Sequence, residues 1–444
     1  MDDTPAPAAA VHSLPPTAKR RRRWPLILLA VLVLAAAIAA GAWRWTHGDD
    51  DDGTIAIAVV YSNDQDSDDF LAGVRIAIAQ LNAQGGILGR PVSERVFQED
   101  AYTDQVALDK LVVRTLRLAT RIGKMPSVLA VIGHGSSSTA IPASAVYNRT
   151  GKLFLATHAT ATSLSNHSQD LTFALQPSNA DNAAVLAEYA RAKGLRRFVI
   201  LSDNSNYGIE TTDRFRAQLA ESGGTILYRD RLTSSNKSID DLLLFLLDNS
   251  LFRRNDIDAI FLTSSSMEDS ARFIARARQL GLAMPILGPE YLTSRDVEEA
   301  VGQAMLSVVA VSLFDGNIDT AEGENLRTAF RRATGRPPGL LAAIGFDAVK
   351  VLAYATNRTK TLNPAAIADT LRIIRYEAPF IGATGPLAFD AHGLVTDTKA
   401  YVVRHDGTSF RTVATYRKPL IPGEDQNTDN ATGSEPTRLE RISP

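Results

Sequence analysis

An alternation of short apolar runs with amphipathic helical stretches begins at Thr54 and constrains the fold most strongly. Repeated strand–helix units favour parallel sheets with helices on both faces. In the first series, strands are expected at 54–60, 92–97, 128–132 and 153–156, with helices around 70–81 and 105–121. After 173–175 the pattern starts again, with strands at 197–201, 225–228, 259–262 and 308–312, and helices at 181–193, 207–222, 239–249 and 269–280. Two such series predict two α/β lobes.

Hydroxyl-bearing residues follow two of the expected strands. The run 128–132 passes through Gly133 and Gly135 into consecutive hydroxyls from Ser136 to Thr139, where a helix is expected to begin. A strand that runs through glycine into helix-capping hydroxyls presents backbone N–H groups to an anion. A similar stretch of small and hydroxyl-bearing residues ends at Thr162. The pattern predicts a carboxylate pocket, and the alternative is two ordinary capped strand–helix junctions.

Composition argues against several classes of function. The chain has 47 Lys and Arg against 49 Asp and Glu, a formal net charge of -2, so nothing favours a nucleic-acid partner. Cysteine is absent, which excludes disulfides, cysteine metal sites and a lipid-modified N-terminal cysteine. His134, His158 and His167 match no established metal-ligand spacing, and no G-x-S-x-G motif occurs. We therefore expect no metal, no cofactor and no catalytic residue.

An uncharged apolar segment, residues 25–42, follows a basic cluster from Lys19 to Arg23. As a helix it would span roughly 27 Å, close to the hydrocarbon thickness of a bilayer. Tryptophans flank it, as interfacial aromatic residues do. The pattern predicts a cytoplasmic basic tail at 1–23, a transmembrane anchor at 24–43 and a binding domain outside the cytoplasm. The alternative is a cleaved signal peptide that releases the chain to the periplasm. The polar end, 418–444, is expected to be a disordered tail.

Several short motifs together resemble the bacterial type I periplasmic binding proteins, in particular the leucine/isoleucine/valine-binding branch. They are NAQGGILG at 82–89, IGHGSSST at 132–139, ATAT at 159–162, Asp203 with Tyr207 and Gly208, GPE at 288–290, GFDAV at 345–349 and GATGPLAFD at 382–390. The resemblance runs from about Ile55 to Tyr416. It implies a two-lobed fold whose three crossovers lie near Leu175, Phe314 and Gly382. The first lobe would combine 54–175 with 315–382, and the second 176–314 with 383–417.

The same resemblance implies a binding site between the lobes. Ser137 and Thr160 would hold a ligand carboxylate by hydroxyl and backbone N–H, with His158 and Ala159 beside them. Tyr207 would come from the second lobe, and Glu290 would accept the ligand ammonium. The residue types suit this chemistry, because a carboxylate needs preorganised donors at a helix start and an ammonium needs a fixed anion.

Two segments depart from the branched-chain pattern. That family places an aromatic residue early in the first lobe, where residues 64–69 are mostly acidic. It places a tyrosine pair after a second-lobe strand, where residues 263–267 are rich in serine. Further pocket candidates are therefore Asp66, Ser136, Ser265 and Ser266. A ligand larger or more polar than leucine is expected.

The resulting hypothesis is a non-enzymatic solute-binding protein outside the cytoplasm. It would capture an amino-acid-like small molecule and present it to a membrane partner, which by family resemblance is an ABC transporter. The alternative is a ligand-sensing receptor or scaffold that regulates a membrane signalling protein. Both functions use the same cleft, so the sequence leaves them open.

Overall fold

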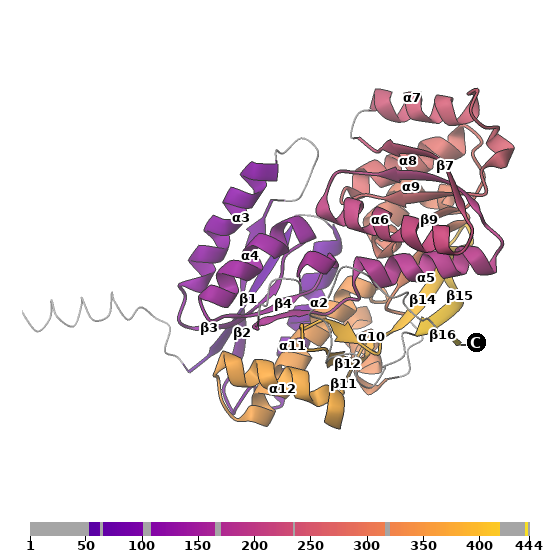
Figure 1. The fold of residues 1–444 in the computed structure, drawn as a ribbon. Helices are drawn as coiled ribbons and strands as arrows, with labels where there is room; N and C mark the ends of the chain where they lie inside the picture. The colour runs from indigo at the N-terminus through magenta and orange to yellow at the C-terminus, as the bar shows by residue number, and fades with distance from the viewer. Residues whose placement is uncertain are drawn as a thin grey trace, which may run out of the picture. The chain divides into compact units, whose positions relative to one another are not determined.

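A five-stranded parallel sheet forms the centre of the first lobe (Figure 1). The computed structural model describes residues 53–62, 65–100, 108–164, 170–233, 236–315, 320–417 and 440–442. The strand order is β2-β1-β3-β4-β5. The strands are β1 at Ile55–Ser62, β2 at Val92–Glu99, β3 at Val128–Gly133, β4 at Leu153–Ala156 and β5 at Thr172–Ala174.

Helices cover both faces of this sheet, and β1 has side chains buried on each face. Ile57 and Val59 of β1 belong to one apolar core, and Ala58 and Val60 belong to the other; successive strand side chains point to opposite faces. The first core includes α2 (Gln65–Ala83), α10 (Ala321–Thr334), α11 (Leu340–Thr359) and α12 (Pro364–Glu377). The second includes α3 (Leu108–Gly123), α4 (Ser137–Arg149) and the short helix η1 (Thr162–Leu164).

The second lobe contains an eight-stranded sheet with the order β16-β15-β14-β10-β9-β8-β6-β7. Its strands are β6 (Arg197–Ser202), β7 (Thr225–Arg231), β8 (Ala259–Thr263), β9 (Ile286–Gly288), β10 (Val308–Ser312), β14 (Lys399–His405), β15 (Phe410–Arg417) and β16 (Glu440–Ile442). The pairs from β6 to β10 are parallel, and those from β14 to β16 are antiparallel. The mixed sheet agrees with a doubly wound lobe that carries an antiparallel edge.

Helices also cover both faces of the second sheet. One core includes α5 (Asn179–Ala192) and α6 (Asn206–Glu221). The other includes α7 (Asn236–Leu247), α8 (Met267–Gln279), α9 (Arg295–Val301) and the 3-10 turns η3 (Glu290–Thr293) and η4 (Gly302–Met305). A further 3-10 turn, η2 (Arg254–Asp256), precedes β8.

Local capping chemistry determines where several helices begin. Ser178 and Asp181 form a reciprocal capping box at the start of α5. The Asn363 side chain accepts two backbone N–H groups at the start of α12, and Pro364 occupies the first helical turn, where a missing N–H is tolerated. Such caps fix helix starts close to the strand ends.

The third crossover lies elsewhere than at Gly382, where the sequence placed it. β11 (Phe380–Gly382), β12 (Gly385–Phe389) and β13 (Val395–Thr396) form a small antiparallel sheet. Leu387, Phe389 and Val395 are buried in a core of the first lobe. Residues 383–396 therefore belong to the first lobe, and the prediction that they belong to the second is wrong. The chain crosses between β13 and β14.

A buried carboxylate explains why the small sheet stays in the first lobe. Asp347 of α11 accepts hydrogen bonds from the backbone N–H groups of Ala383 and Thr384, at 2.6 and 2.8 Å, and from the Thr384 hydroxyl at 2.6 Å. Burial raises the pKa of Asp347 to about 6 although these donors lower it. This carboxylate ties the motif at 345–349 to the motif at 382–390.

Two predictions concern the chain termini. Residues 440–442 form β16, which pairs with β15, so the expectation of a disordered tail is wrong for these residues. The predicted anchor at 24–43 and the basic tail at 1–23 lie outside the described residues. Within the described part of the chain, α11 alone is long and apolar enough to span a bilayer, and most of it is buried in the first lobe. Core helices pass the same test of length and composition.

Candidate functional site

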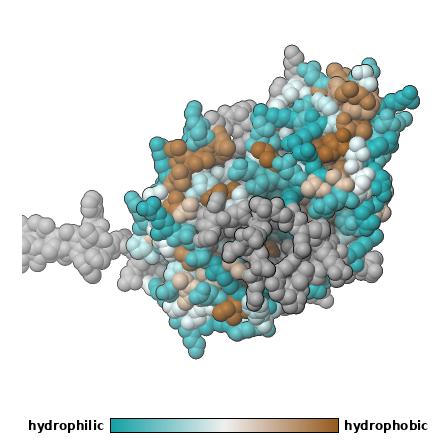
Figure 2. Space-filling view, viewed as in Figure 1, coloured by the Kyte–Doolittle hydropathy of each residue, from teal (hydrophilic) through white to brown (hydrophobic). Residues whose placement is uncertain are grey.

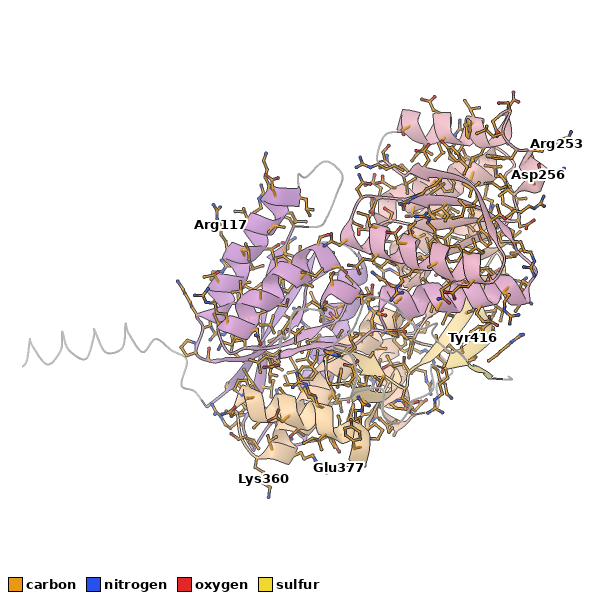
Figure 3. The ribbon with its side chains drawn as sticks, viewed as in Figure 1. Arg117, Arg253, Asp256, Lys360, Glu377 and Tyr416 are labelled. Atoms are coloured by element: carbon orange, nitrogen blue, oxygen red, sulfur yellow. The ribbon has the colours of Figure 1, made fainter. Side chains whose placement is uncertain are left out.

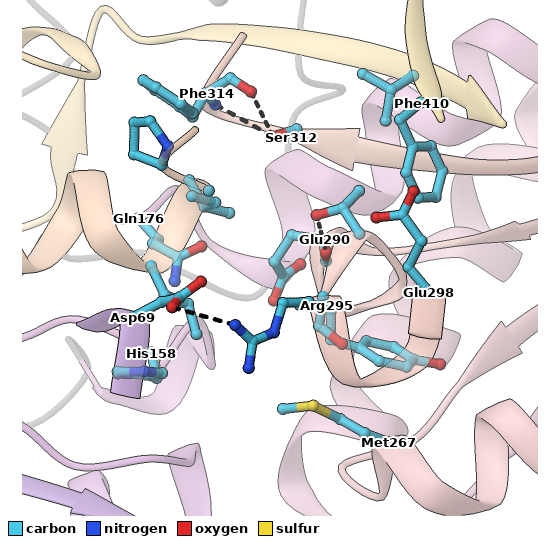
Figure 4. A pocket seen from close by; sticks show the side chains of 18 of the residues that line it. Asp69, His158, Gln176, Met267, Glu290, Arg295, Glu298, Ser312, Phe314 and Phe410 are labelled. Carbon is cyan, nitrogen blue, oxygen red and sulfur yellow. Dashed lines mark hydrogen bonds and ion pairs between the residues drawn. The ribbon is translucent and has the colours of Figure 1, made fainter. Parts of the chain in front are cut away.

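A cavity of about 780 Å³ lies between the two lobes, at the carboxyl ends of their parallel strands. Open α/β sheets bind ligands at this edge. Figure 4 shows Asp69, His158, Glu290 and Arg295 around the same space. The part of the cavity lined by the predicted residues contains Gly135, Ser136, Ser137, His158, Tyr207, Ser265 and Glu290.

The wall from the first lobe is built around the buried carboxylate of Glu99. It accepts hydrogen bonds from the Gly135 backbone N–H at 2.6 Å and from the Thr139 hydroxyl at 3.0 Å. Its other oxygen lies 2.7 Å from Nδ1 of His134, whose Nε2 lies 3.0 Å from the Tyr147 hydroxyl. Burial opposes the charge on Glu99, but the His134 ring and the two donors keep its pKa below the usual value. Glu99 thus fixes the loop that carries Ser136 and Ser137.

The turn after β3 requires glycine at one position. Gly133 has φ 124°, and a Cβ atom there would lie 1.9 Å from the carbonyl oxygen of Val60. His134 follows with φ 54°, a left-handed conformation that costs energy for a residue with a side chain. The buried contacts of the His134 ring hold this conformation. The turn brings the start of α4, whose first N–H groups have no intrahelical partner, to the cavity.

A second buried carboxylate, Asp203 at the end of β6, organises the wall from the second lobe. Asp203 accepts hydrogen bonds from the backbone N–H and hydroxyl of Ser205, at 3.0 and 2.5 Å. It also accepts from the Ser264 hydroxyl at 3.0 Å and from the Ser265 N–H at 2.6 Å. Burial raises the pKa of Asp203 although these hydrogen bonds lower it. The loops after β6 and β8 are therefore joined beneath the cavity.

Close packing beneath Tyr207 also depends on Asp203. A Cβ atom on Gly208 would lie 2.1 Å from Oδ1 of Asp203, so only glycine fits there without a shift. Gly208 N–H donates to the Ser205 hydroxyl at 2.9 Å, which caps α6. Tyr207 is thereby held at the first turn of this helix, where its side chain lines the cavity.

Glu290 is a buried carboxylate that faces the cavity from the second lobe. The residue follows β9, begins the 3-10 turn η3, and is only 9% exposed. Its carboxylate accepts from the Tyr207 hydroxyl and from Nδ2 of Asn182, each at 3.1 Å. Burial raises its pKa to about 7, although hydrogen bonding from Tyr207 opposes the rise. Such a carboxylate gains most from a cationic group that enters the cavity.

An ion cluster crosses the cavity and was not predicted from the sequence. Asp69 of α2 accepts two hydrogen bonds from Arg336, which precedes α11 in the same lobe. Arg295 of α9, in the opposite lobe, lies 3.6 Å from the same carboxylate (Figure 4). All three residues line the cavity. They come from segments that are far apart in the sequence and share no motif, so spacing gave no signal for them.

Gln176, beside the first crossover, was also missed. It lines the cavity with 2% exposure, and its Nε2 donates to the Thr157 carbonyl at 2.6 Å. Its Oε1 is buried with no hydrogen-bond partner among the described residues. A buried acceptor in a cavity wall favours a ligand with a hydrogen-bond donor nearby.

The predicted site residues fall into three groups. Those that line the cavity are Ser136, Ser137, His158, Tyr207, Ser265 and Glu290. Those that are close in sequence to the lining residues but do not line the cavity are Ala159, Thr160 and Ser266. The Thr160 hydroxyl donates to Oδ1 of Asn179 at 2.5 Å, and the Ser266 hydroxyl caps α8. The side chain of Asp66 lies outside the described part of the structure.

Two α/β lobes, three connecting segments and a cavity at facing strand ends define the class of two-lobed solute-binding proteins. A sequence model of the periplasmic binding protein family matches residues 61–409, and the chain therefore belongs to that family. Membership implies a location outside the cytoplasm. Across the described residues, no group of three or more His, Cys, Asp or Glu side chains is placed to hold a metal ion.

Characterised relatives share this family and its transporter context. The chain is 24% identical over 323 residues to the leucine-, isoleucine-, valine-, threonine- and alanine-binding protein of Pseudomonas aeruginosa, covering 72% of this chain and 81% of that protein. An ABC transporter substrate-binding protein of Desulfitobacterium hafniense in complex with Leu is 25% identical, with a TM-score of 0.66, covering 81% of this chain and all of that one. These relatives are binding proteins and not enzymes.

A third similarity concerns the fold alone. The branched-chain amino acid transporter substrate binding protein of Streptococcus pneumoniae, in complex with isoleucine, is 21% identical with a TM-score of 0.71. The match covers 81% of this chain and 98% of that chain. The two-lobed architecture is therefore shared across distant members of the family.

Proposed function

We propose that this protein binds an amino-acid-like small molecule between its lobes and presents it to an ABC transporter. The observation that carries the proposal is that Ser137 and Glu290, from opposite lobes, line one cavity. Ser137 lies at the start of a helix, where a carboxylate can bind, and Glu290 is a buried anion that can bind an ammonium group. The amino-acid-binding relatives from Pseudomonas and Desulfitobacterium support the same ligand class.

The carboxylate end of the ligand lies against the first lobe in this proposal. The Ser137 hydroxyl and the first N–H groups of α4 would donate to it, and His158 would contact it from the adjacent loop. Ser137 Oγ already accepts weakly from the Ala161 N–H, at 3.3 Å, which leaves its own proton for the ligand. The Thr160 hydroxyl donates its proton to Asn179. Ser137 is therefore the hydroxyl that would bind the ligand carboxylate.

The ammonium end lies against Glu290. Tyr207 and Asn182 orient the carboxylate from two sides, and a ligand cation would approach from the cavity. The acidic and arginine side chains of Asp69, Arg295 and Arg336 then surround the remainder of the ligand. A polar ligand side chain can hydrogen-bond to this ion cluster, whereas a leucine side chain would remove water from its charges without offering a hydrogen bond in return.

Titration calorimetry of residues 53–444 against a panel of amino acids tests this proposal. Glu290→Gln should weaken the best ligand at least about thirtyfold, since an unpaired buried ammonium costs roughly 2–5 kcal/mol. Ser137→Ala should cost less, roughly 1–2 kcal/mol, because backbone donors remain. Two matched controls are Glu299→Gln, an exposed glutamate in the following helix α9, and Ser138→Ala, which is beside Ser137 but does not line the cavity.

Three outcomes of these titrations count against the proposal. Absence of binding to every amino acid would reject the ligand class. Unchanged affinity in Glu290→Gln would reject the ammonium assignment and favour a solute without an amine. Tight binding of leucine, equal to that of polar amino acids, would reject only the expected selectivity.

Membrane anchoring through residues 25–42 is the second part of the proposal. Its support is the apolar length of that segment, the basic residues before it and the tryptophans beside it. We expect the full chain to remain with membranes after extraction with high salt and to be released only by detergent. N-terminal sequencing of the mature protein is the decisive measurement, and a chain that starts near Ala42 or Trp43 would reject the anchor.

The anchor also supports a second candidate function, ligand sensing. An anchored binding domain can regulate a neighbouring membrane protein without delivering solute to a permease. Deletion of the protein should abolish uptake of the best ligand if the first function holds. Normal uptake together with loss of a ligand-dependent cellular response would favour sensing.

A further inference from the structure

A stripe of basic residues runs along the outer side of α3. Lys110, Arg114, Arg117, Arg121 and Lys124 are all exposed. The spacing of four and three residues places the first four on one side of the helix, and Lys124 directly follows its last residue. The opposite side packs into the lobe through Leu111, Thr115, Ala119 and Ile122. The stripe is therefore a surface feature that the packing of the first lobe does not require.

Apolar side chains lie beside the basic stripe. Val113 is 45% exposed, Leu116 is 37% exposed, and Leu108 in the first turn is 42% exposed. Figure 2 shows hydrophobic surface over the region of α3. Arg117 points away from the lobe in Figure 3. We call these exposed basic and apolar residues together the α3 face.

Few acidic groups neutralise the stripe within the described part of the chain. Asp109 is the one acidic residue of α3. Arg114 pairs with Asp100 at 2.8 Å, but both side chains are about half exposed, at 59% and 46%. Arg121 lies over the ring of Phe97, 5.4 Å from its centre. A surface with excess positive charge and exposed aliphatic side chains favours an anionic partner that also accepts apolar groups.

The C-terminal end of α3 lies close to the point where the N-terminal chain joins the lobe. The end of α3 leads into Ser127, whose carbonyl accepts from the Ala56 N–H of β1 at 3.3 Å. Lys124 and Arg121 are therefore at the end of the lobe where residue 53 enters. The connecting residues 43–53 reach at most about 35 Å when extended. A helix of 16 residues is about 24 Å long, so the whole face lies within reach of an anchored segment.

We propose that the α3 face docks on a bilayer that carries anionic phospholipid. Lys and Arg side chains would meet the phosphate groups, and Val113 and Leu116 would enter the interface between headgroups and acyl chains. This function goes beyond ligand capture and does not depend on the occupant of the cavity. It would hold the domain against the membrane on its first-lobe side.

A lipid surface suits the α3 face better than a protein partner does. The basic groups extend along a whole helix in one line, as a surface with spread negative charge requires. Arg114, Arg117 and Arg121 also line a pocket of about 340 Å³, but the acidic residues Glu99 and Asp100 in its wall disfavour a discrete anion there. Each basic residue near an anionic membrane adds a modest contribution, so several must act together. A tethered domain needs only this modest affinity, because the anchor supplies a high local lipid concentration.

Vesicle binding by residues 53–444 tests the proposal. This part contains all four hydrophobic cores, and the Desulfitobacterium hafniense structure, all of which is covered by the match, matches 81% of this chain. Sedimentation with vesicles of phosphatidylcholine, with and without phosphatidylglycerol, should show binding to the anionic vesicles only, and the binding should fall as salt rises. Removal of three charges in Arg114→Gln/Arg117→Gln/Arg121→Gln should lower it on the order of 100-fold.

Matched variants distinguish the α3 face from general charge. Arg216→Gln/Arg331→Gln/Arg332→Gln removes three exposed charges elsewhere and should bind anionic vesicles as the wild type does. Val113→Ser/Leu116→Ser should weaken binding severalfold without changing its salt dependence. Circular dichroism and the amino-acid titration check that each variant is folded.

Three results would overturn the proposal. They are absence of binding to anionic vesicles, equal binding to neutral vesicles, and equal loss in the control triple variant. A photocrosslinker at Leu116 that captures a protein and no lipid in intact cells would instead assign the face to a protein partner. Amino-acid binding is measured separately, so failure here leaves the proposed ligand function untouched.

Discussion

At the scale of single residues, Glu290 combines burial with a position on the cavity wall. Its pKa of about 7 means that a proton and a ligand ammonium compete for the same carboxylate near neutral pH. The donors Tyr207 and Asn182 reduce the cost of the charge but do not remove it. Ligand binding is therefore linked to proton release from this residue.

The affinity for an amino acid should rise with pH through about 7 and reach a plateau above it. Below this pKa, the ionised fraction of Glu290 falls about tenfold per pH unit, and the affinity should fall in proportion. The ligand-free protein shows the opposite trend, because a carboxyl with a raised pKa favours the folded state most at low pH. Titration calorimetry at about pH 5 and about pH 8 measures the change. Glu290→Gln is the control and should flatten the profile, and an equally steep profile in that variant would assign the proton elsewhere.

At the scale of secondary-structure elements, each lobe uses one buried carboxylate to fix the loops that line the cavity. Glu99 joins the end of β2 to the start of α4, and Asp203 joins the loops after β6 and β8. Neither side chain needs to touch a ligand to have this effect. Both lobes thus hold their cavity loops with a buried carboxylate, although the carboxylate and its hydrogen-bond donors differ between them.

Asp203→Asn should destabilise the second lobe and weaken ligand binding together. The amide keeps one acceptor but presents an NH₂ group to donors, so at least one buried N–H or O–H loses its partner, at a cost of about 1–3 kcal/mol. Tyr207 and Ser265 lose their fixed positions as a result. Chemical denaturation and titration calorimetry measure the two effects. Asp213→Asn on α6, whose carboxylate is exposed, should change neither, and a stable Asp203→Asn with normal affinity would reject this role.

The sequence predicted elements well where apolar periodicity was clear. Helices α5 to α8 begin and end within a few residues of their expected bounds, because each contains core residues at helical spacing. Helix α11 was not predicted, because it is buried on nearly all sides and its sequence therefore lacks an amphipathic pattern. The third crossover was misplaced because β12 and β13 are short and rich in turn residues, so their burial in the first lobe left no periodic pattern.

Residues of the candidate site could be predicted from the sequence only where they lie in a recognisable local motif. Ser137, Tyr207 and Glu290 each follow a strand in a recognisable stretch, and all three line the cavity. Asp69 and Arg295 meet only through folding, and nothing around either residue marks it as a partner of the other. Thr160 shows the converse, since its motif matched but its hydroxyl is committed to Asn179.

At the scale of the whole binding domain, polar contacts connect the lobes in addition to the hydrogen bond from Thr160 to Asn179. Arg295 of the second lobe lies 3.6 Å from Asp69 of the first. Glu210 of α6 accepts from the Thr162 N–H at 2.8 Å and from the Ser163 hydroxyl at 2.7 Å, both in η1 of the first lobe. These contacts break if the lobes separate about their connecting segments. They therefore favour the arrangement in which both walls of the cavity face each other.

Arg295→Gln should lower ligand affinity about fivefold, because a partly exposed ion pair contributes about 1 kcal/mol to the closed arrangement. The stability of the second lobe should change little, since the side chain is 24% exposed and lies on the cavity surface. Asp69→Asn should have a larger effect, because Arg336 also loses its acceptor.

A double-mutant cycle with both substitutions isolates the contact between the lobes. The effects of Asp69→Asn and Arg295→Gln on affinity should be less than additive, with a coupling of about 1 kcal/mol. Glu299→Gln removes the other ion pair of Arg295, 3.4 Å away within α9, and should leave affinity within about twofold. Strict additivity would show that the two residues act on the ligand independently, and the contact would then have no part in holding the lobes together.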